Sequence, residues 1–227
     1  MVTWFFGASS DWSQQLISKL NGQVFQFSRS AELRRNPDID AITVEYDPVG
    51  AKEWIETVAL MQPKPNKVIF NINTGNVKEL SENIIEDVSN EYEHFNEWWF
   101  NNREQLFFRT LLMNFLHKTY NFQGEVCHIT SQISADHNPR WKDLQMYKTL
   151  RAVDYELIWN NRNNGMDAYG ICPAANTRPL EWADFIAFQI NAGNLGKNNW
   201  LYGVDEVVDT GELRMIKYGD WSNEGIV

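Results

Sequence analysis

The stretch VTWFFGASSDWS (Val2–Ser13) joins an apolar run to a glycine and then to the polar start of an amphipathic segment. The run Val2–Phe6 has the composition of a buried strand, and apolar residues recur at helical spacing over Ser13–Leu20. A strand that passes through a short loop into a helix is the repeating unit of folds in which helices connect parallel strands. The opening of the chain therefore predicts an α/β fold.

The rest of the chain continues this alternation. Further strands are predicted at Gln23–Phe27, Ala41–Tyr46, Lys67–Ile72, Glu125–Thr130, Ala168–Cys172 and Val204–Val208. Further helices are predicted at Ala51–Met61, Val77–Val88, Glu91–Tyr120, Lys142–Asn160 and Leu180–Asn191. We expect the longest helix to break near Asn101–Asn102, because an unbroken helix of that length is unusual in a globular domain. Right-handed crossovers then predict one doubly wound domain over residues 1–227, with about seven parallel strands and helices on both faces.

Composition narrows the classes of function. A chain of 227 residues with 43% hydrophobic content can bury a large core, and its net charge of -10 argues against binding to nucleic acid. No apolar stretch reaches the roughly 18 residues that a transmembrane helix needs. The N-terminus lacks the basic segment and the small-residue cleavage pattern of a signal peptide, so none is predicted.

The cysteines and histidines suggest no metal or disulfide chemistry. Cys127 and Cys172 each lie in an apolar run, which predicts buried thiols and a cytoplasmic compartment. The four histidines show no ligand spacing, so no metal site is predicted.

A tyrosine and an arginine provide the best clue to chemistry. Tyr147 and Arg151 stand four residues apart in a helical stretch, YKTLRAVDYELIW, and therefore share one helix face. A nearby cation favours the phenolate, so this pair could lower the tyrosine pKa and suit it to proton transfer. The preceding strand ends at Ser131, whose hydroxyl could hold a carbonyl oxygen or only satisfy the backbone at the strand end.

In their order and spacing these motifs resemble the short-chain dehydrogenase/reductases, a Rossmann-type family that uses NAD or NADP. The resemblance covers nearly the whole chain. It rests on GASSDWS (Gly7–Ser13), SRS (Ser28–Ser30), Asp47, NINTG (Asn71–Gly75), NREQLFF (Asn102–Phe108), ITS, YKTLR, PAANT (Pro173–Thr177) and WLYGVDEVVDTGE (Trp200–Glu212).

The resemblance implies a set of site residues. The implied catalytic residues are Tyr147 as general acid/base, Ser131 to orient the carbonyl, Arg151 to hold ribose, and Asn102 to organise a relay water or to stabilise a helix kink. The implied cofactor-binding residues are Gly7, Ser9, Ser10, Trp12, Arg29, Asp47, Asn71, Arg151, Pro173 and Thr177. Arg29 favours NADP over NAD, because an arginine there can pair with the 2′-phosphate, although it could also be an ordinary surface arginine.

Several residues depart from the family pattern at the site itself. Asp11 and Ser13 stand where the family has glycines, Ala174 replaces another glycine, and Arg151 replaces a lysine. We expect Asp11 either to cap the first helix itself, in competition with a phosphate, or to point outward.

Two readings of function follow. The first is an NADP(H)-dependent oxidoreductase that interconverts a small alcohol and a carbonyl. The alternative is a family descendant of weak or no activity, which acts as a dinucleotide-binding sensor or an assembly protein. Aromatic residues over Phe95–Tyr120, together with the Tyr147 helix, predict a homodimer or homotetramer, with Trp98, Trp99, Phe107 and Phe108 as surplus apolar surface.

Overall fold

The computed structural model describes residues 1–29, 36–72, 88–130, 145–173, 180–207 and 209–217. Within them the chain forms one eight-stranded sheet in the order β3-β2-β1-β4-β5-β6-β7-β8. Neighbouring strands are parallel from β3 to β7, and only β8 runs antiparallel, against β7. The strands are β1 (Val2–Phe6), β2 (Gln23–Ser28), β3 (Ile42–Thr43), β4 (Lys67–Phe70), β5 (Glu125–Ile129), β6 (Asp167–Pro173), β7 (Leu201–Glu206) and β8 (Leu213–Lys217).

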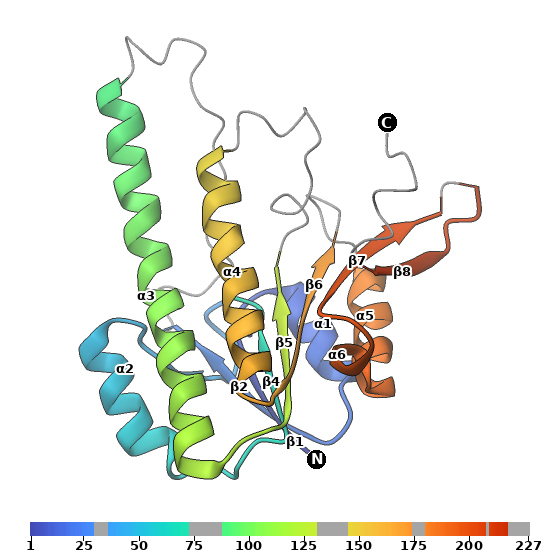
Figure 1. Ribbon diagram of the computed structural model, residues 1–227, viewed down its shortest axis with the longest axis horizontal. Coiled ribbons are helices and arrows are strands. Elements are labelled where there is room, and N and C mark those ends of the chain that lie inside the picture. The colour runs from blue at the N-terminus through green and yellow to red at the C-terminus, as the bar shows by residue number, and fades with distance from the viewer. Residues whose placement is uncertain (30–35, 73–87, 131–144, 174–179, 208, 218–227) are drawn as a thin grey trace.

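Helices cover both faces of this sheet, as expected of a doubly wound fold (Figure 1). One face carries α2 with its π-helical continuation, α3 and α4, and the other carries α1 and α5. The helices are α1 (Asp11–Lys19), α2 (Pro48–Trp54), the π-helix η2 (Ile55–Ala59), α3 (Val88–Tyr120), α4 (Gln145–Asn163), α5 (Leu180–Ala192) and α6 (Leu195–Asn198). No helix among the described residues is long and apolar enough to cross a membrane.

The apolar first strand is buried on both sides, which explains why its residues do not alternate with polar ones. Phe6 joins the core cluster under α2, α3 and α4, whereas Phe5 joins the cluster under α1 and α5. Because successive strand residues point to opposite faces, the run of aromatic residues in β1 supplies both cores.

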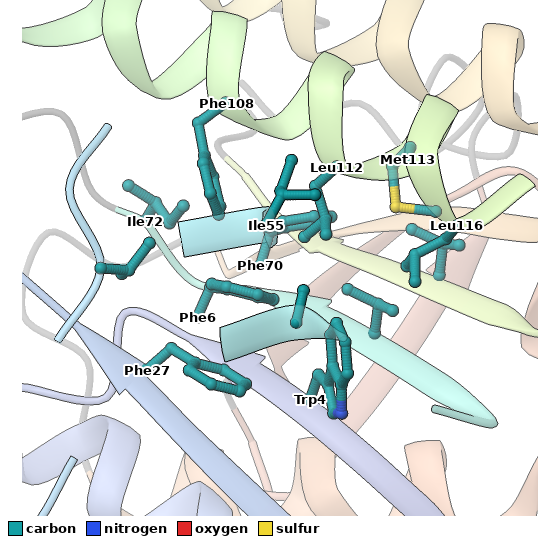
Figure 2. Close-up of a cluster of buried hydrophobic side chains, with 14 of the residues drawn as sticks. Trp4, Phe6, Phe27, Ile55, Phe70, Ile72, Phe108, Leu112, Met113 and Leu116 are labelled. Carbon is teal, nitrogen blue, oxygen red and sulfur yellow. The ribbon is translucent and has the colours of Figure 1, made fainter. Parts of the chain in front are cut away.

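Phe6 is the centre of an aromatic core on the α2–α3 face (Figure 2). Its ring stacks on Phe27 at 4.7 Å and on Phe70 at 5.3 Å, and it meets Trp54 and Phe108 edge-on at 5.7 Å and 5.4 Å. Stacked and edge-on pairs of this kind add stabilisation beyond the area that they bury. Much of the aromatic content of the chain is therefore core.

The structure differs from the sequence-based expectation in the longest helix. The expected break near Asn101–Asn102 is wrong, because α3 continues as α-helix through both residues and is 33 residues long. Asparagine costs a helix interior only about 0.7 kcal/mol or less, so packing of the buried face of α3 against the sheet outweighs it. The predicted helix Val77–Val88 lies almost entirely outside the described residues.

The C-terminal edge of the sheet also differs. The predicted strand Val204–Val208 lies at Leu201–Glu206, and it is followed by β8, which the sequence reading did not anticipate. Gly211 has φ of +69°, a left-handed conformation that lets the chain reverse between β7 and β8. The sheet therefore has the expected seven parallel strands and one additional antiparallel edge strand.

Candidate functional site

The candidate site lies where the strand order reverses. From β1 the chain crosses to β2 and β3 on one side of the sheet, and from β4 it continues to β5, β6 and β7 on the other. Crossovers that diverge in this way leave a crevice at the carboxyl ends of β1 and β4, which is where doubly wound folds bind their ligands. The turn after β1 opens α1 at this position.

Gly7 makes the turn after β1 possible. Its φ is +91°, and a Cβ atom at this residue would lie 2.2 Å from the carbonyl oxygen of Asn71. Its amide also donates to the carbonyl oxygen of Phe27 at 2.9 Å. Only glycine fits this conformation and this spacing, so Gly7 joins the ends of β1, β2 and β4.

Two serines and Asn71 hold the same turn from within. Ser13 Oγ donates to the carbonyl oxygen of Gly7 at 2.8 Å and contacts Ser10 Oγ at 2.8 Å. Asn71 Nδ2 donates to Ser13 Oγ at 2.9 Å, and the Ser13 side chain is buried. The Ser13 hydroxyl, at a position where the sequence resemblance implies a glycine, thus faces back into the protein. Its bonds stabilise the turn.

Ser10, and not Asp11, caps α1. Ser10 Oγ accepts a hydrogen bond from the Ser13 amide at 3.1 Å, whereas Asp11 is the first helical residue and is exposed. The expectation that Asp11 could cap the helix itself is therefore wrong. The reason is local: a side chain caps from the residue before the first turn, and Ser10 occupies that position.

The neighbouring residues of the loop have different roles. Trp12 is buried in the cluster under α1 and α5, so its ring is part of the core. Ser9 is half-buried, and its carbonyl oxygen accepts from the Asn36 amide at 3.2 Å.

Two of the expected cofactor-binding residues, Arg29 and Asp47, lie after β2 and β3. Arg29 directly follows β2 and is half-buried. Burial raises the pKa of Tyr46, and the positive charges of Arg29 and Arg109 oppose that rise. Asp47 caps α2, because its Oδ1 accepts from the amides of Val49 at 3.0 Å and Gly50 at 3.1 Å.

The structure describes only some of the expected site residues at the ends of β5 and β6. Pro173 ends β6, is buried, and lies opposite Val204 of β7. Thr177 and Ala174, together with the catalytic candidate Ser131, lie outside the described residues.

The remaining catalytic candidates are on α3 and α4. Asn102 is buried on α3. Positions 147 and 151 lie within α4, and helical periodicity puts them on the same face as Asp154 and Ile158, which are both buried. Positions 147 and 151 are therefore on the same side of α4 as two buried residues further along the helix, Asp154 and Ile158.

The sequence analysis did not predict a buried polar network that lies next to these candidates. Arg109 of α3 pairs with Asp154 of α4, with 2.7 Å between Nη2 and Oδ1. Thr130, directly after β5, donates from Oγ1 to the other carboxylate oxygen of Asp154 at 2.8 Å. His128 of β5 lies 3.5 Å from Arg109 through Nδ1 and 3.3 Å from the Asn161 amide nitrogen through Nε2.

Burial keeps the histidine of this network neutral. Desolvation, followed by the positive charge of Arg109, lowers the pKa of His128 to about 3, and only Asp154 opposes the shift. The ring also stacks on Phe70, with centroids 5.1 Å apart. Arg109 and Asp154 each stand at a position where helical spacing predicts a buried apolar residue. Charged residues are seldom fully buried unless they are paired, so this was the sequence signal that could have revealed the pair.

A second buried cation, Lys67, lies at the amino ends of the central strands β4 and β5. Lys67 Nζ contacts Glu125 Oε2 at 2.9 Å and donates to the Ile190 carbonyl in the last turn of α5 at 2.9 Å. Tyr169 donates to the other oxygen of Glu125. Cys127 and Cys172 are buried thiols that form no disulfide, as predicted. No group of three His, Cys, Asp or Glu side chains in the described ranges is arranged to hold a metal ion.

The chain is similar to known proteins in structure but not in sequence. The sequence matches no protein-family model and no curated protein. The structure is similar to a short-chain dehydrogenase from Mycobacterium avium, with a TM-score of 0.62 and 12% identity over 95% of this chain and 84% of that one. It is also similar to a short-chain dehydrogenase from Bacillus anthracis, with a TM-score of 0.62 and 13% identity over 88% and 92% of the two chains.

A third similar structure is an oxidoreductase of the short-chain dehydrogenase/reductase family from Brucella ovis, in complex with a partially ordered NAD. Its TM-score is 0.55, and it is 18% identical over 83% of this chain and 90% of that one. The fold is therefore the Rossmann-type fold of the short-chain dehydrogenase/reductases, as the sequence motifs predicted.

Proposed function

We propose that the protein is an oxidoreductase of the short-chain dehydrogenase/reductase type, which interconverts a small alcohol and a carbonyl compound with a nicotinamide dinucleotide. The observation that carries the proposal is the β1–α1 turn at the switch point. Gly7 has no room for a side chain, the Ser13 hydroxyl faces back into the protein, and the cap of α1 is the neutral Ser10 rather than the carboxylate of Asp11. The N-terminus of α1 is thus built as a turn that suits a pyrophosphate.

The bound cofactor supplies or accepts the hydride, and the protein supplies the proton and the geometry. Tyr147 donates a proton to the carbonyl oxygen in reduction and takes it back in oxidation. Ser131 donates a hydrogen bond to the same oxygen and orients it. Arg151 holds the ribose and favours the phenolate of Tyr147 by its charge, while Asn102 organises a relay water.

The test of this function uses a panel of aldehydes and ketones with NADPH, followed by the absorbance of the reduced nicotinamide. We expect slow but measurable reduction, because Arg151 keeps the positive charge but is bulkier than a lysine at this position. A protein that binds NADPH and reduces no compound of the panel contradicts the enzyme proposal. In that case the alternative, a dinucleotide sensor or assembly protein, replaces it. Asp11, exposed in the first turn of α1, is the feature that favours this alternative.

We further propose a preference for NADP(H). Arg29 follows β2 directly, with Ser28 as the last strand residue, so no carboxylate stands at the strand end to bind a free ribose hydroxyl. A guanidinium can instead hold the 2′-phosphate through two hydrogen bonds.

The Arg29→Ala variant tests this preference. Loss of a charged hydrogen bond should weaken NADPH binding by about 1–3 kcal/mol and leave NADH binding within twofold. Calorimetric titration of both cofactors measures the effect. Arg214→Ala on β8 is the control, because this arginine is exposed at the far edge of the sheet and should change neither affinity. A wild-type protein that binds NADH as tightly as NADPH contradicts the preference.

We also propose that the protein forms a homodimer or homotetramer through α3 and α4. Trp99 and Phe107 of α3 are 39% and 43% exposed, and Trp159 of α4 is 43% exposed. Phe108, in contrast, is fully buried in the aromatic core and adds nothing to this surface, contrary to the expectation from the sequence.

Light scattering with Phe107→Glu tests the assembly. A carboxylate in an apolar interface should shift the protein to the monomer at micromolar concentration. Met61→Glu is the control, because Met61 is 81% exposed and follows η2, outside helices α3 and α4. A wild-type protein that is strictly monomeric contradicts the proposal.

A further inference from the structure

The Arg109–Asp154–Thr130 network connects the three elements that carry the candidate catalytic residues. Arg109 is on α3, Asp154 is on α4, and Thr130 follows β5. Both oxygens of the Asp154 carboxylate have a partner, one in Arg109 and one in Thr130. The buried carboxylate of Asp154 therefore joins α3, α4 and the end of β5.

Each of the three residues of this network lies close in sequence to a catalytic candidate. Arg109 is two helical turns after Asn102, at the spacing of seven residues that returns to the same helix face. Asp154 is one turn after Arg151 and two turns after Tyr147, again on one face. Thr130 is the residue before Ser131.

A buried ion pair of this kind stabilises a fold poorly. The Arg109 and Asp154 side chains are 5% and 2% exposed, so both charges have lost most of their hydration. The cost of removing two ions from water often cancels their attraction, and an apolar pair of similar volume is frequently as stable or more stable. Unlike an apolar pair, this network fixes the relative orientation of its side chains, because a guanidinium and a hydroxyl bond the carboxylate at defined angles.

We propose that Arg109, Asp154 and Thr130 are positioning residues for the catalytic groups. They fix α3, α4 and the end of β5 relative to one another, and so hold positions 102, 147 and 151 in a fixed arrangement. This inference rests on the proposed oxidoreductase function. It goes beyond that function by assigning a role to three residues that do not themselves touch substrate or cofactor.

Thr130→Val tests the proposal with the smallest change in shape. The variant removes the hydroxyl that bonds Asp154 and keeps the side-chain volume. We expect kcat to fall about ten- to a hundredfold, because small misplacements of reacting groups have effects of this size. The Kd for NADPH should change much less than kcat, because the turn after β1 is held by Ser13 and Asn71 and not by this network. Thr130→Ser, which keeps the hydroxyl, should restore most of kcat.

Thr3→Val is the matched control. Thr3 is also buried in the sheet, on β1, but its hydroxyl has no hydrogen-bond partner among the described residues. The same chemical change there should leave kcat unaltered. If Thr130→Val retains full kcat in an active enzyme, or if the two variants lower kcat equally, the positioning role is overturned.

A second measurement does not depend on activity. Hydrogen exchange of the amides of residues 145–154 should become about tenfold faster in Thr130→Val and unchanged in Thr3→Val, with recovery in Thr130→Ser. If the wild-type protein reduces no carbonyl compound but shows this exchange pattern, the positioning network stands and the oxidoreductase proposal fails. If exchange in Thr130→Val equals that of the wild type, the positioning proposal is overturned irrespective of activity.

Discussion

Tyr147→Phe is expected to lower the turnover of carbonyl reduction about 10²–10⁴-fold or more, the range typical of removing a general acid/base. The variant loses only the phenolic hydroxyl, so the proton that the carbonyl oxygen needs has no donor at this position. NADPH affinity should change little, because the hydroxyl acts on the substrate. The measurement is kcat with the best carbonyl substrate, together with Kd for NADPH.

Two companion variants make this result specific. Tyr155→Phe is the matched control on the same helix: its ring packs edge-on against Trp200 at 5.5 Å, in an aromatic contact that phenylalanine can keep. Its turnover should equal that of the wild type. Arg151→Lys should raise turnover, because a compact ammonium keeps the charge beside Tyr147 and reaches the ribose more easily. Full turnover in Tyr147→Phe would show that another group supplies the proton.

The second large effect is a loss of stability in mild acid that depends on His128. Its pKa is about 3 in the folded protein and 6.5 when unperturbed, because burial and then Arg109 disfavour the imidazolium. Between these values the unfolded chain binds a proton that the folded chain does not. The stabilisation is therefore fully present above pH 6.5 and is lost as the pH falls towards 3. With about 1.4 kcal/mol per unit of pKa, the loss reaches about 3 kcal/mol at pH 4.5.

Urea unfolding at pH 7 and pH 4.5 measures this loss. Carboxyl groups titrate in the same range, so the informative quantity is the difference between variant and wild type. His128→Gln should be less stable than the wild type at pH 7, but its stability should fall by about 3 kcal/mol less on acidification. His117→Gln, the same substitution on the half-buried part of α3, is the comparison variant. An equal acid loss in His128→Gln and wild type would contradict the assignment.

The sequence by itself determined the architecture. The apolar runs were long enough and regular enough to predict the seven parallel strands, and the order of short motifs predicted the fold despite identities below 20% to the similar structures. Gly7 could be read directly, because a turn from a buried strand into a helix needs a residue without a side chain. Local propensity and hydrophobic periodicity depend only on residues that are close together in the chain, so they can be recognised from the sequence alone.

Only the tertiary structure decided the contacts between distant segments. The unbroken α3, the bond from Asn71 to Ser13 and the burial of Phe108 all depend on packing partners that are far away in the chain. The clearest case is the Arg109–Asp154–Thr130 network. In the sequence these residues are a cation and an acid at apolar-face positions of two separate helices and a residue next to a strand end, and nothing there joins them. Burial between two helices and a strand, which removes water from the charges and leaves them only each other, turns them into one unit.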